Sequence, residues 1–72
     1  MNTLASILDQ HRKELHLTDA AFARRMGITR ALWASVKNGH SNPGMKVVRA
    51  AMRRFPELQL KISIYLSGFG GD

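Results

Sequence analysis

The chain has 72 residues, a net charge of +6 and no cysteine. A chain this short forms a single domain with a small core, and such domains often gain stability by pairing with a second copy. The absence of cysteine excludes disulfides and thiolate metal sites. No secretory signal pattern is visible and no apolar run approaches the roughly 18 residues that cross a bilayer, so we expect a cytoplasmic protein without a membrane partner.

The positive charge is concentrated in the middle of the chain, because no Asp or Glu occurs between Ala20 and Pro56. The basic residues of this stretch are Arg24, Arg25, Arg30, Lys37, Lys46, Arg49, Arg53 and Arg54. Such a block is typical of surfaces that bind nucleic acid, since each phosphate that Lys or Arg neutralises releases condensed counterions. A basic surface that is merely solvated explains the charge equally well.

Helical spacing of apolar residues predicts four helices in the first part of the chain. They are expected over residues 3–15, 19–26, 30–38 and 45–55. The first of them is amphipathic, with apolar residues on one face and charged residues on the other. Pro56 ends the last, because proline cannot continue a helix.

The two middle helices are joined by a very short connection. Gly27 suits the left-handed residue that ends a helix, and Thr18 and Thr29 are good caps for the N-termini of the two helices. Because only Gly27, Ile28 and Thr29 separate the helices, the chain has to turn sharply between them. These features predict a helix-turn-helix.

From Leu58 onward the apolar spacing changes to strict alternation. The apolar positions are Leu58, Leu60, Ile62, Ile64 and Leu66. Alternation is typical of a strand, and since no second strand is visible we expect this one to pair antiparallel with its copy in a homodimer. A fifth helix over the same residues is the alternative. Three closing glycines predict a flexible tail over residues 68–72.

The sequence TDAAFARRMGITRALWASVKNG, residues 18–39, resembles the helix-turn-helix of the Cro and phage-repressor family, also called the xenobiotic-response-element family. The residues that carry the resemblance are Leu17, Thr18, Phe22, Ala23, Gly27, Ile28, Thr29, Trp33, Val36, Asn38, Gly39 and Pro43. It implies an all-α fold, a lambda-repressor-like four-helix domain over residues 1–57, followed by a β-strand over 58–67 that pairs across a homodimer. That strand resembles the one that HipB-type antitoxins share between their subunits.

The resemblance also implies which residues touch DNA. The third helix would enter the major groove and place Thr29, Arg30, Ala31 and Ser35 at the bases. Arg30 is the strongest candidate for reading a base, because a guanidinium can donate two hydrogen bonds to a guanine. A phosphate contact or a solvated side chain is the alternative for Arg30. Contacts to the phosphate backbone would come from Thr18, Asp19, Lys37, Asn38, His40, Asn42 and Lys46.

Three positions depart from the pattern that DNA binding or the family favours. The charge of Asp19 repels phosphate, so we expect the backbone amides beside it, rather than its carboxylate, to face DNA. Lys37 stands where many family members have a Glu that pairs with an arginine of the first helix, here aligned with Arg12, which leaves Glu14 or a phosphate as its partner. Leu32 replaces a residue that is commonly small and polar, and it either packs on the fourth helix or lies exposed beside DNA.

These residues predict a homodimeric transcriptional repressor that binds double-stranded DNA at a pseudo-palindromic operator with half-sites about 34 Å apart. The alternative is an antitoxin that binds a toxin protein and represses its own operon, and a phage regulator without a protein partner fits the same residues. No enzyme activity, metal or cofactor is expected, because His11, His16 and His40 are dispersed and no phosphate-binding glycine loop is present. RNA binding is less favoured, since the chain lacks aromatic pairs that stack single-stranded bases.

Overall fold

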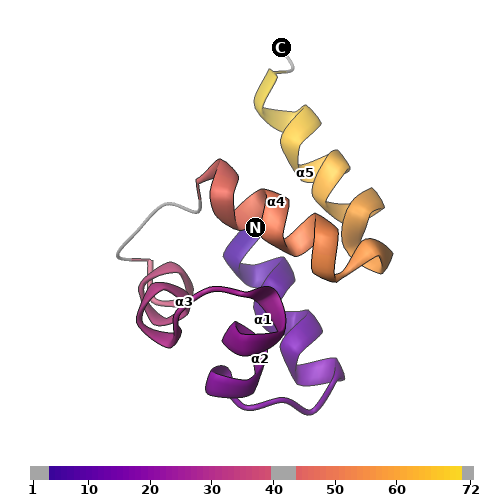
Figure 1. Ribbon diagram of the computed structural model, residues 1–72. Coiled ribbons are helices and arrows are strands. Elements are labelled where there is room, and N and C mark those ends of the chain that lie inside the picture. Colours follow the sequence, from indigo (N-terminus) through magenta and orange to yellow (C-terminus); the bar gives the residue numbers. More distant parts are fainter. Residues whose placement is uncertain (1–3, 40–43, 71–72) are drawn as a thin grey trace.

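The structure, a computed structural model, describes residues 4–39 and 44–70. All regular structure in these residues is helical. The elements in chain order are α1 (Leu4–Glu14), α2 (Asp19–Met26), α3 (Arg30–Lys37), α4 (Met45–Arg54), the 3₁₀ turn η1 (Pro56–Leu58) and α5 (Gln59–Gly70). Figure 1 shows α1 to α4 gathered into one body, with α5 extending away from it toward the C-terminus.

The four helices predicted in the first part of the chain are confirmed, and so are the caps of α2 and α3. The Thr18 hydroxyl accepts a hydrogen bond from the Ala21 N–H at 3.1 Å, and the Thr29 hydroxyl accepts one from the Leu32 N–H at 3.0 Å. Gly27 has a φ of +76°, so α2 ends in the left-handed conformation that favours glycine. The short turn after Gly27 leads directly into α3, as the sequence predicts.

A row of aromatic side chains forms the centre of the core. Phe22, Trp33 and Phe55 are fully buried. The ring of Phe22 stacks on that of Phe55 with centroids 5.3 Å apart, and its centroid lies 4.8 Å from that of Trp33. His11 of α1 meets Phe55 edge-on at 5.0 Å. Since these four rings come from α1, α2, α3 and the end of α4, the aromatic row ties the helices of the body together.

The strand predicted over residues 58–67 is wrong. These residues belong to η1 and α5, so the alternative of a fifth helix is the correct one. Without this strand, the expected sheet between two subunits cannot form. The residues expected to build it are helical: Leu58, Leu60, Ile62, Ile64 and Leu66. The helix also continues to Gly70, within the segment expected to form a flexible tail.

A sequence with apolar residues at every second position also has apolar residues four positions apart, so it can form an apolar stripe on a helix as well as an apolar face on a strand. Leu58 and Ile62, four residues apart, are 3% and 0% exposed, and Leu66 packs at the edge of the core four residues further on. Leu60 and Ile64 form a second stripe, which is 72% and 62% exposed. Residues four apart share one face of a helix, while residues two apart lie on nearly opposite faces. Alternation therefore cannot distinguish a strand from a helix that is apolar on two sides.

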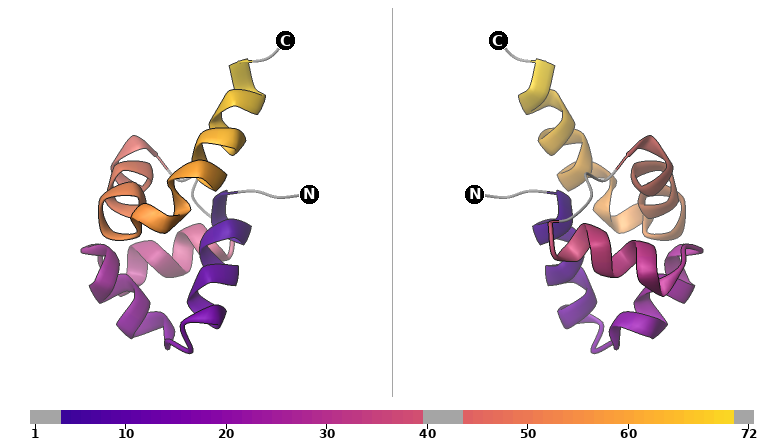
Figure 2. Two further views of the ribbon diagram at one scale, coloured as in Figure 1. Left: turned by 90° about the vertical axis from the view of Figure 1, so that its right-hand side faces the viewer. Right: turned by 90° about the vertical axis from the view of Figure 1, so that its left-hand side faces the viewer.

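The C-terminal helix lies against part of the body only. It packs against α1, α4 and η1. Figure 2 shows, from two directions, that α5 then rises clear of the other helices toward the C-terminus. One side of α5 is therefore left uncovered within the chain.

The helical register predicts opposite responses at two positions that a strand would place on the same face. Ile62→Ala should lower the free energy of unfolding by about 2–5 kcal/mol, because it empties a fully buried site. Leu60→Ala should change it by less than about 0.5 kcal/mol in dilute protein, where association does not contribute. Urea unfolding followed by circular dichroism measures both variants, and equal losses would contradict the helix.

Candidate nucleic-acid interface

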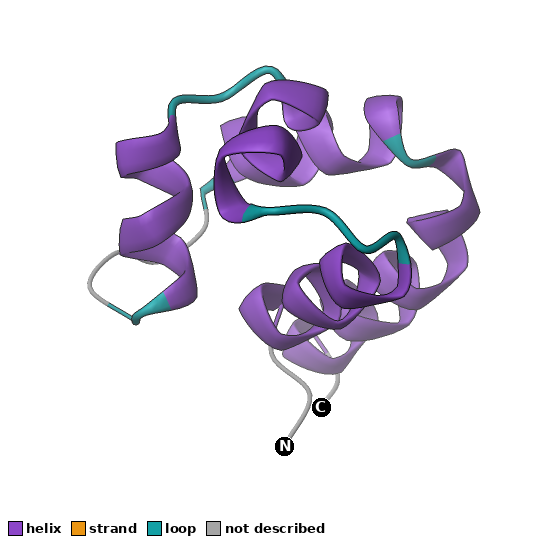
Figure 3. Cartoon of the chain, turned by 90° about the horizontal axis from the view of Figure 1, so that it is seen from below, coloured by secondary structure: helices purple, strands orange, loops and turns teal. Residues whose placement is uncertain are grey.

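The outer face of α3 is uncovered. Trp33 points into the core and is fully buried, whereas Arg30, Ala31 and Ala34 are exposed. The helix lies at the edge of the body in Figure 1, and it is the helix at the left of Figure 3, where the molecule is seen from below. A ligand can therefore approach the whole length of this face.

Thr29 and Ser35, two of the residues expected to contact bases, are less available to a ligand than Arg30 and Ala31. The hydroxyl of Thr29 is engaged as the cap of α3, at 3.0 Å from the Leu32 N–H. Ser35 is half-buried, one turn after the exposed Ala31. Arg30 and Ala31 thus form the most accessible part of the predicted base-contacting set.

The carboxylate of Asp19, at the N-terminus of α2, holds α3 in position. Trp33 Nε1 donates a hydrogen bond to Asp19 Oδ1 at 2.9 Å, and Lys37 Nζ lies 3.0 Å from Oδ2. Arg12 Nε of α1 lies 3.3 Å from Oδ1. One carboxylate therefore joins α1, α2 and α3. We call this arrangement of Arg12, Asp19, Trp33 and Lys37 the Asp19 hub.

The contacts of the Asp19 hub keep Asp19 ionised and balance its negative charge at the N-terminus of α2. The hydrogen bond from Trp33, and next that from Lys37, hold the pKa of Asp19 below its ordinary value of 3.8. Asp19 is therefore ionised at neutral pH, but Lys37 and Arg12 balance its charge. The expected partner of Lys37 is corrected, because Lys37 pairs with Asp19 and not with Glu14.

The structure describes only some of the residues expected to contact the phosphate backbone. The hydroxyl of Thr18 is used as the α2 cap, accepting from the Ala21 N–H. Asn38, after the end of α3, and Lys46, in the first turn of α4, are exposed. His40 and Asn42 lie outside the described residues.

Leu32 packs inward. It is half-buried and lies against the hydrophobic core, so the open choice between packing and exposure beside DNA is decided for packing. The N-terminal turn of α3 therefore offers Arg30 and Ala31 to a ligand, while Leu32 helps to anchor the same turn to the body.

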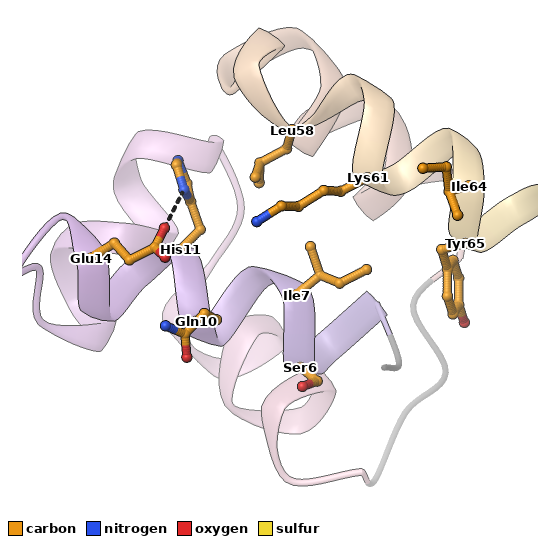
Figure 4. A pocket seen from close by; sticks show the side chains of 9 residues that line it. All are labelled: Ser6, Ile7, Gln10, His11, Glu14, Leu58, Lys61, Ile64 and Tyr65. Atoms are coloured by element: carbon orange, nitrogen blue, oxygen red, sulfur yellow. Dashed lines mark ion pairs between the residues drawn. The ribbon is translucent and has the colours of Figure 1, made fainter. Parts of the chain in front are cut away.

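A groove runs between α1 and α5 on another part of the molecule. Its volume is about 580 Å³, and Figure 4 shows Ile7, Leu58 and Lys61 pointing into it. His11 lines the groove too, and its Nε2 lies 2.8 Å from Glu57 Oε2. This side chain is a packed core histidine, only 8% exposed, with its polar atoms paired.

The Asp19 hub is the functional feature that sequence reasoning missed. From the sequence, Trp33 is identified only as a residue that carries the family resemblance, and Asp19 as a charge that repels phosphate. A usable signal was present, because the indole N–H of a buried tryptophan needs an acceptor. The opening residue of the preceding helix provides one.

The described residues contain no group of three or more His, Cys, Asp or Glu side chains that could hold a metal ion. Over the same ranges, no helix has the length and apolar character needed to cross a membrane. Comparison of the chain with family models, with curated proteins and with solved structures gave no match.

The lowered pKa of Asp19 predicts how its contribution depends on pH. A carboxylate whose pKa is lower in the folded than in the unfolded state stabilises the fold above its unfolded pKa, and this stability is lost as the pH falls through the folded pKa. Asp19→Asn should therefore lower the free energy of unfolding near neutral pH, by about 1 kcal/mol for a partly exposed network. The difference between variant and parent should begin to shrink as the pH falls to 3.8, and it should vanish below the lowered pKa of the folded state.

Urea unfolding at a series of pH values measures the convergence. Glu14→Gln is the matched control, since it removes an exposed carboxylate outside the Asp19 hub. A difference between parent and Asp19→Asn that stays constant down to low pH would contradict the role given to the Asp19 charge.

Proposed function

We propose that the chain is a helix-turn-helix protein of the lambda-repressor type that binds double-stranded DNA with the outer face of α3 and acts as a transcriptional repressor. The observation that carries the proposal is the uncovered face of α3, which begins at the exposed Arg30 and is held to α1 and α2 by the Asp19 hub. A rigidly held helix with one open face fits the major groove of B-DNA, which is about 12 Å wide.

The side chains of this face suit close approach to a groove. Ala31 and Ala34 are small and exposed, so they let the helix backbone come near the base edges. Arg30 is long and exposed at the N-terminal turn, which is the part of a recognition helix that meets bases. Its guanidinium can donate to two acceptors of one guanine.

The charge of the described residues supports a polyanionic ligand. Each described carboxylate is in contact with a side chain of α1 or α3: Asp9 with Arg12 and Lys13, Asp19 with Arg12 and Lys37, and Glu14 and Glu57 with His11, which carries a charge only when it is protonated. Arg30 and Lys46 form no ion pair within the described residues. The charges of Arg30 and Lys46 are therefore available to DNA phosphates. A phosphate that approaches them does not have to displace a carboxylate of the described residues.

Two copies are proposed to act together, meeting on α5 rather than on a strand. Leu60 and Ile64 are 72% and 62% exposed on the uncovered side of α5, where a second copy would shield them from water. The neighbouring groove carries Glu14 and Lys61, opposite charges that a twofold contact could pair between copies. A dimer would present two α3 helices to a pseudo-palindromic operator.

Arg30 and Lys46 test the proposal because they are assigned different tasks. Arg30→Ala should cost roughly 1–3 kcal/mol of binding and relax the preference at one base pair of the half-site. Lys46→Ala should weaken binding to all sequences alike and reduce the slope of affinity against salt by about one. Selection of bound duplexes from a random pool, for the parent and both variants, measures base preference and provides the duplexes for titration.

The two variants act as controls for each other, since each removes one exposed cation. If both lose affinity equally and without change in base preference, Arg30 does not read a base. If the parent selects no sequence at all, α3 is not a recognition helix and the proposed function is wrong.

The position of the dimer contact can be tested separately. Ile64→Glu places a charge in the exposed apolar stripe of α5 and should shift the protein to monomer in sedimentation equilibrium. Ala34→Glu adds the same charge at an exposed position of α3, away from α5, and should leave the dimer intact. A dimer that survives Ile64→Glu would place the contact elsewhere on the molecule.

A further inference from the structure

We propose that a second basic surface, on α4 and the turn between α2 and α3, binds a protein segment that carries carboxylates around an apolar side chain. This surface is a hollow of about 330 Å³, which we call the arginine groove. It is lined by the cations Lys46, Arg49, Arg53 and Arg54 and by Met26, Gly27, Ile28 and Ala50. The proposal goes beyond DNA binding and does not depend on it.

The fold places these cations on one stripe. Lys46, Arg49 and Arg53 are spaced three and four residues apart on α4, and this spacing puts them on one side of the helix. Arg54 turns toward Gly27, and its Nη2 would lie 3.4 Å from a Cβ built on that glycine. The guanidinium of Arg54 therefore lies directly beside the turn at Gly27.

The basic surface continues past the arginine groove. Arg54 also lines a neighbouring hollow, together with Arg24 and Arg25 of α2. Arg25 is partly committed, because its guanidinium lies 5.9 Å from the Phe55 ring centroid. Arg24 and Arg54 thus extend the charge of the arginine groove along α2.

The carboxylates of the described residues do not pair with these cations. Within the described residues, Arg24, Lys46, Arg49, Arg53 and Arg54 form no ion pair. The carboxylates that the structure describes are held by α1 side chains and by Lys37, as set out above. A group of arginines without carboxylates repels itself, and a partner that supplies carboxylates removes that repulsion.

The groove has the shape and chemistry of a peptide site rather than of a DNA contact. Its lining includes the half-buried Ile28 and Ala50 beside the buried Met26, which give it an apolar part that a phosphate backbone does not use. A hollow of about 330 Å³ has room for a few side chains. Arginine favours planar carboxylates because its guanidinium can donate two parallel hydrogen bonds.

The arginine groove is also separate from the proposed recognition face. The exposed residues of that face, Arg30, Ala31 and Ala34, do not line it. A protein segment held on α4 would therefore leave the outer face of α3 open. It would compete with DNA only for Lys46, which lines the groove and is also the proposed phosphate contact.

A synthetic peptide of glutamates interspersed with leucines is the probe, and the same peptide with glutamines in place of the glutamates is its control. Titration of the full chain by NMR should shift the methyl signals of Ile28, Ala50 and Met26 with the acidic peptide only. The double variant Arg49→Ala with Arg53→Ala should weaken the binding at least about tenfold, because it removes two unpaired cations from the groove. Both residues are exposed and unpaired among the described residues, so the fold should persist.

The matched control is Lys13→Glu, which lowers the net charge by the same two units at an exposed position outside the groove. It should leave peptide affinity within about twofold of the parent. An equal loss in the double variant and in Lys13→Glu would reduce the effect to net charge and overturn the proposal. Shifts of the Ile28 and Ala50 methyls by a short DNA duplex, with none from the peptide, would also overturn it and assign the groove to DNA.

Discussion

The hydrogen bond from the Trp33 indole to the Asp19 carboxylate is the contact on which the arrangement of α2 and α3 depends. The same tryptophan ring packs against Phe22 in the core, so one side chain ties α3 to α2 by both apolar and polar contacts. Arg12 and Lys37 complete the site by balancing the carboxylate charge. Because the inner side of α3 is fixed in this way, its outer side can remain free of packing partners without loss of order.

This arrangement separates charge across the molecule. Carboxylates are paired with side chains of α1 and with the end of α3, whereas the arginines of α2 and α4 stay open to solvent within the described residues. The open cations form two surfaces, one beside the outer face of α3 and one at the arginine groove, and Lys46 belongs to both. We propose one polyanion and one acidic protein as their ligands, because the groove combines its cations with the apolar side chains of Ile28 and Ala50.

Local signals predicted α1 to α4 well. Thr18, Gly27 and Thr29 each satisfy or free particular backbone groups, and these requirements act within a few residues. The segment after Pro56 was assigned to a strand because apolar residues at every second position also fall four apart, and only packing of Ile62 under α1 and α4 decides between the two. The Asp19 hub was not predicted because it also depends on packing: it joins side chains that are distant in sequence.

The central claim is that the uncovered face of α3 contacts double-stranded DNA, and chemical-shift mapping with a short duplex tests it most directly. The account predicts that backbone amide shifts gather at Arg30, Ala31 and Ala34 and at the start of α4, and that they diminish steeply as salt is raised. The exposed side of α5 should be unaffected. Shifts that leave α3 untouched at low salt, or no shifts at all, would contradict the account.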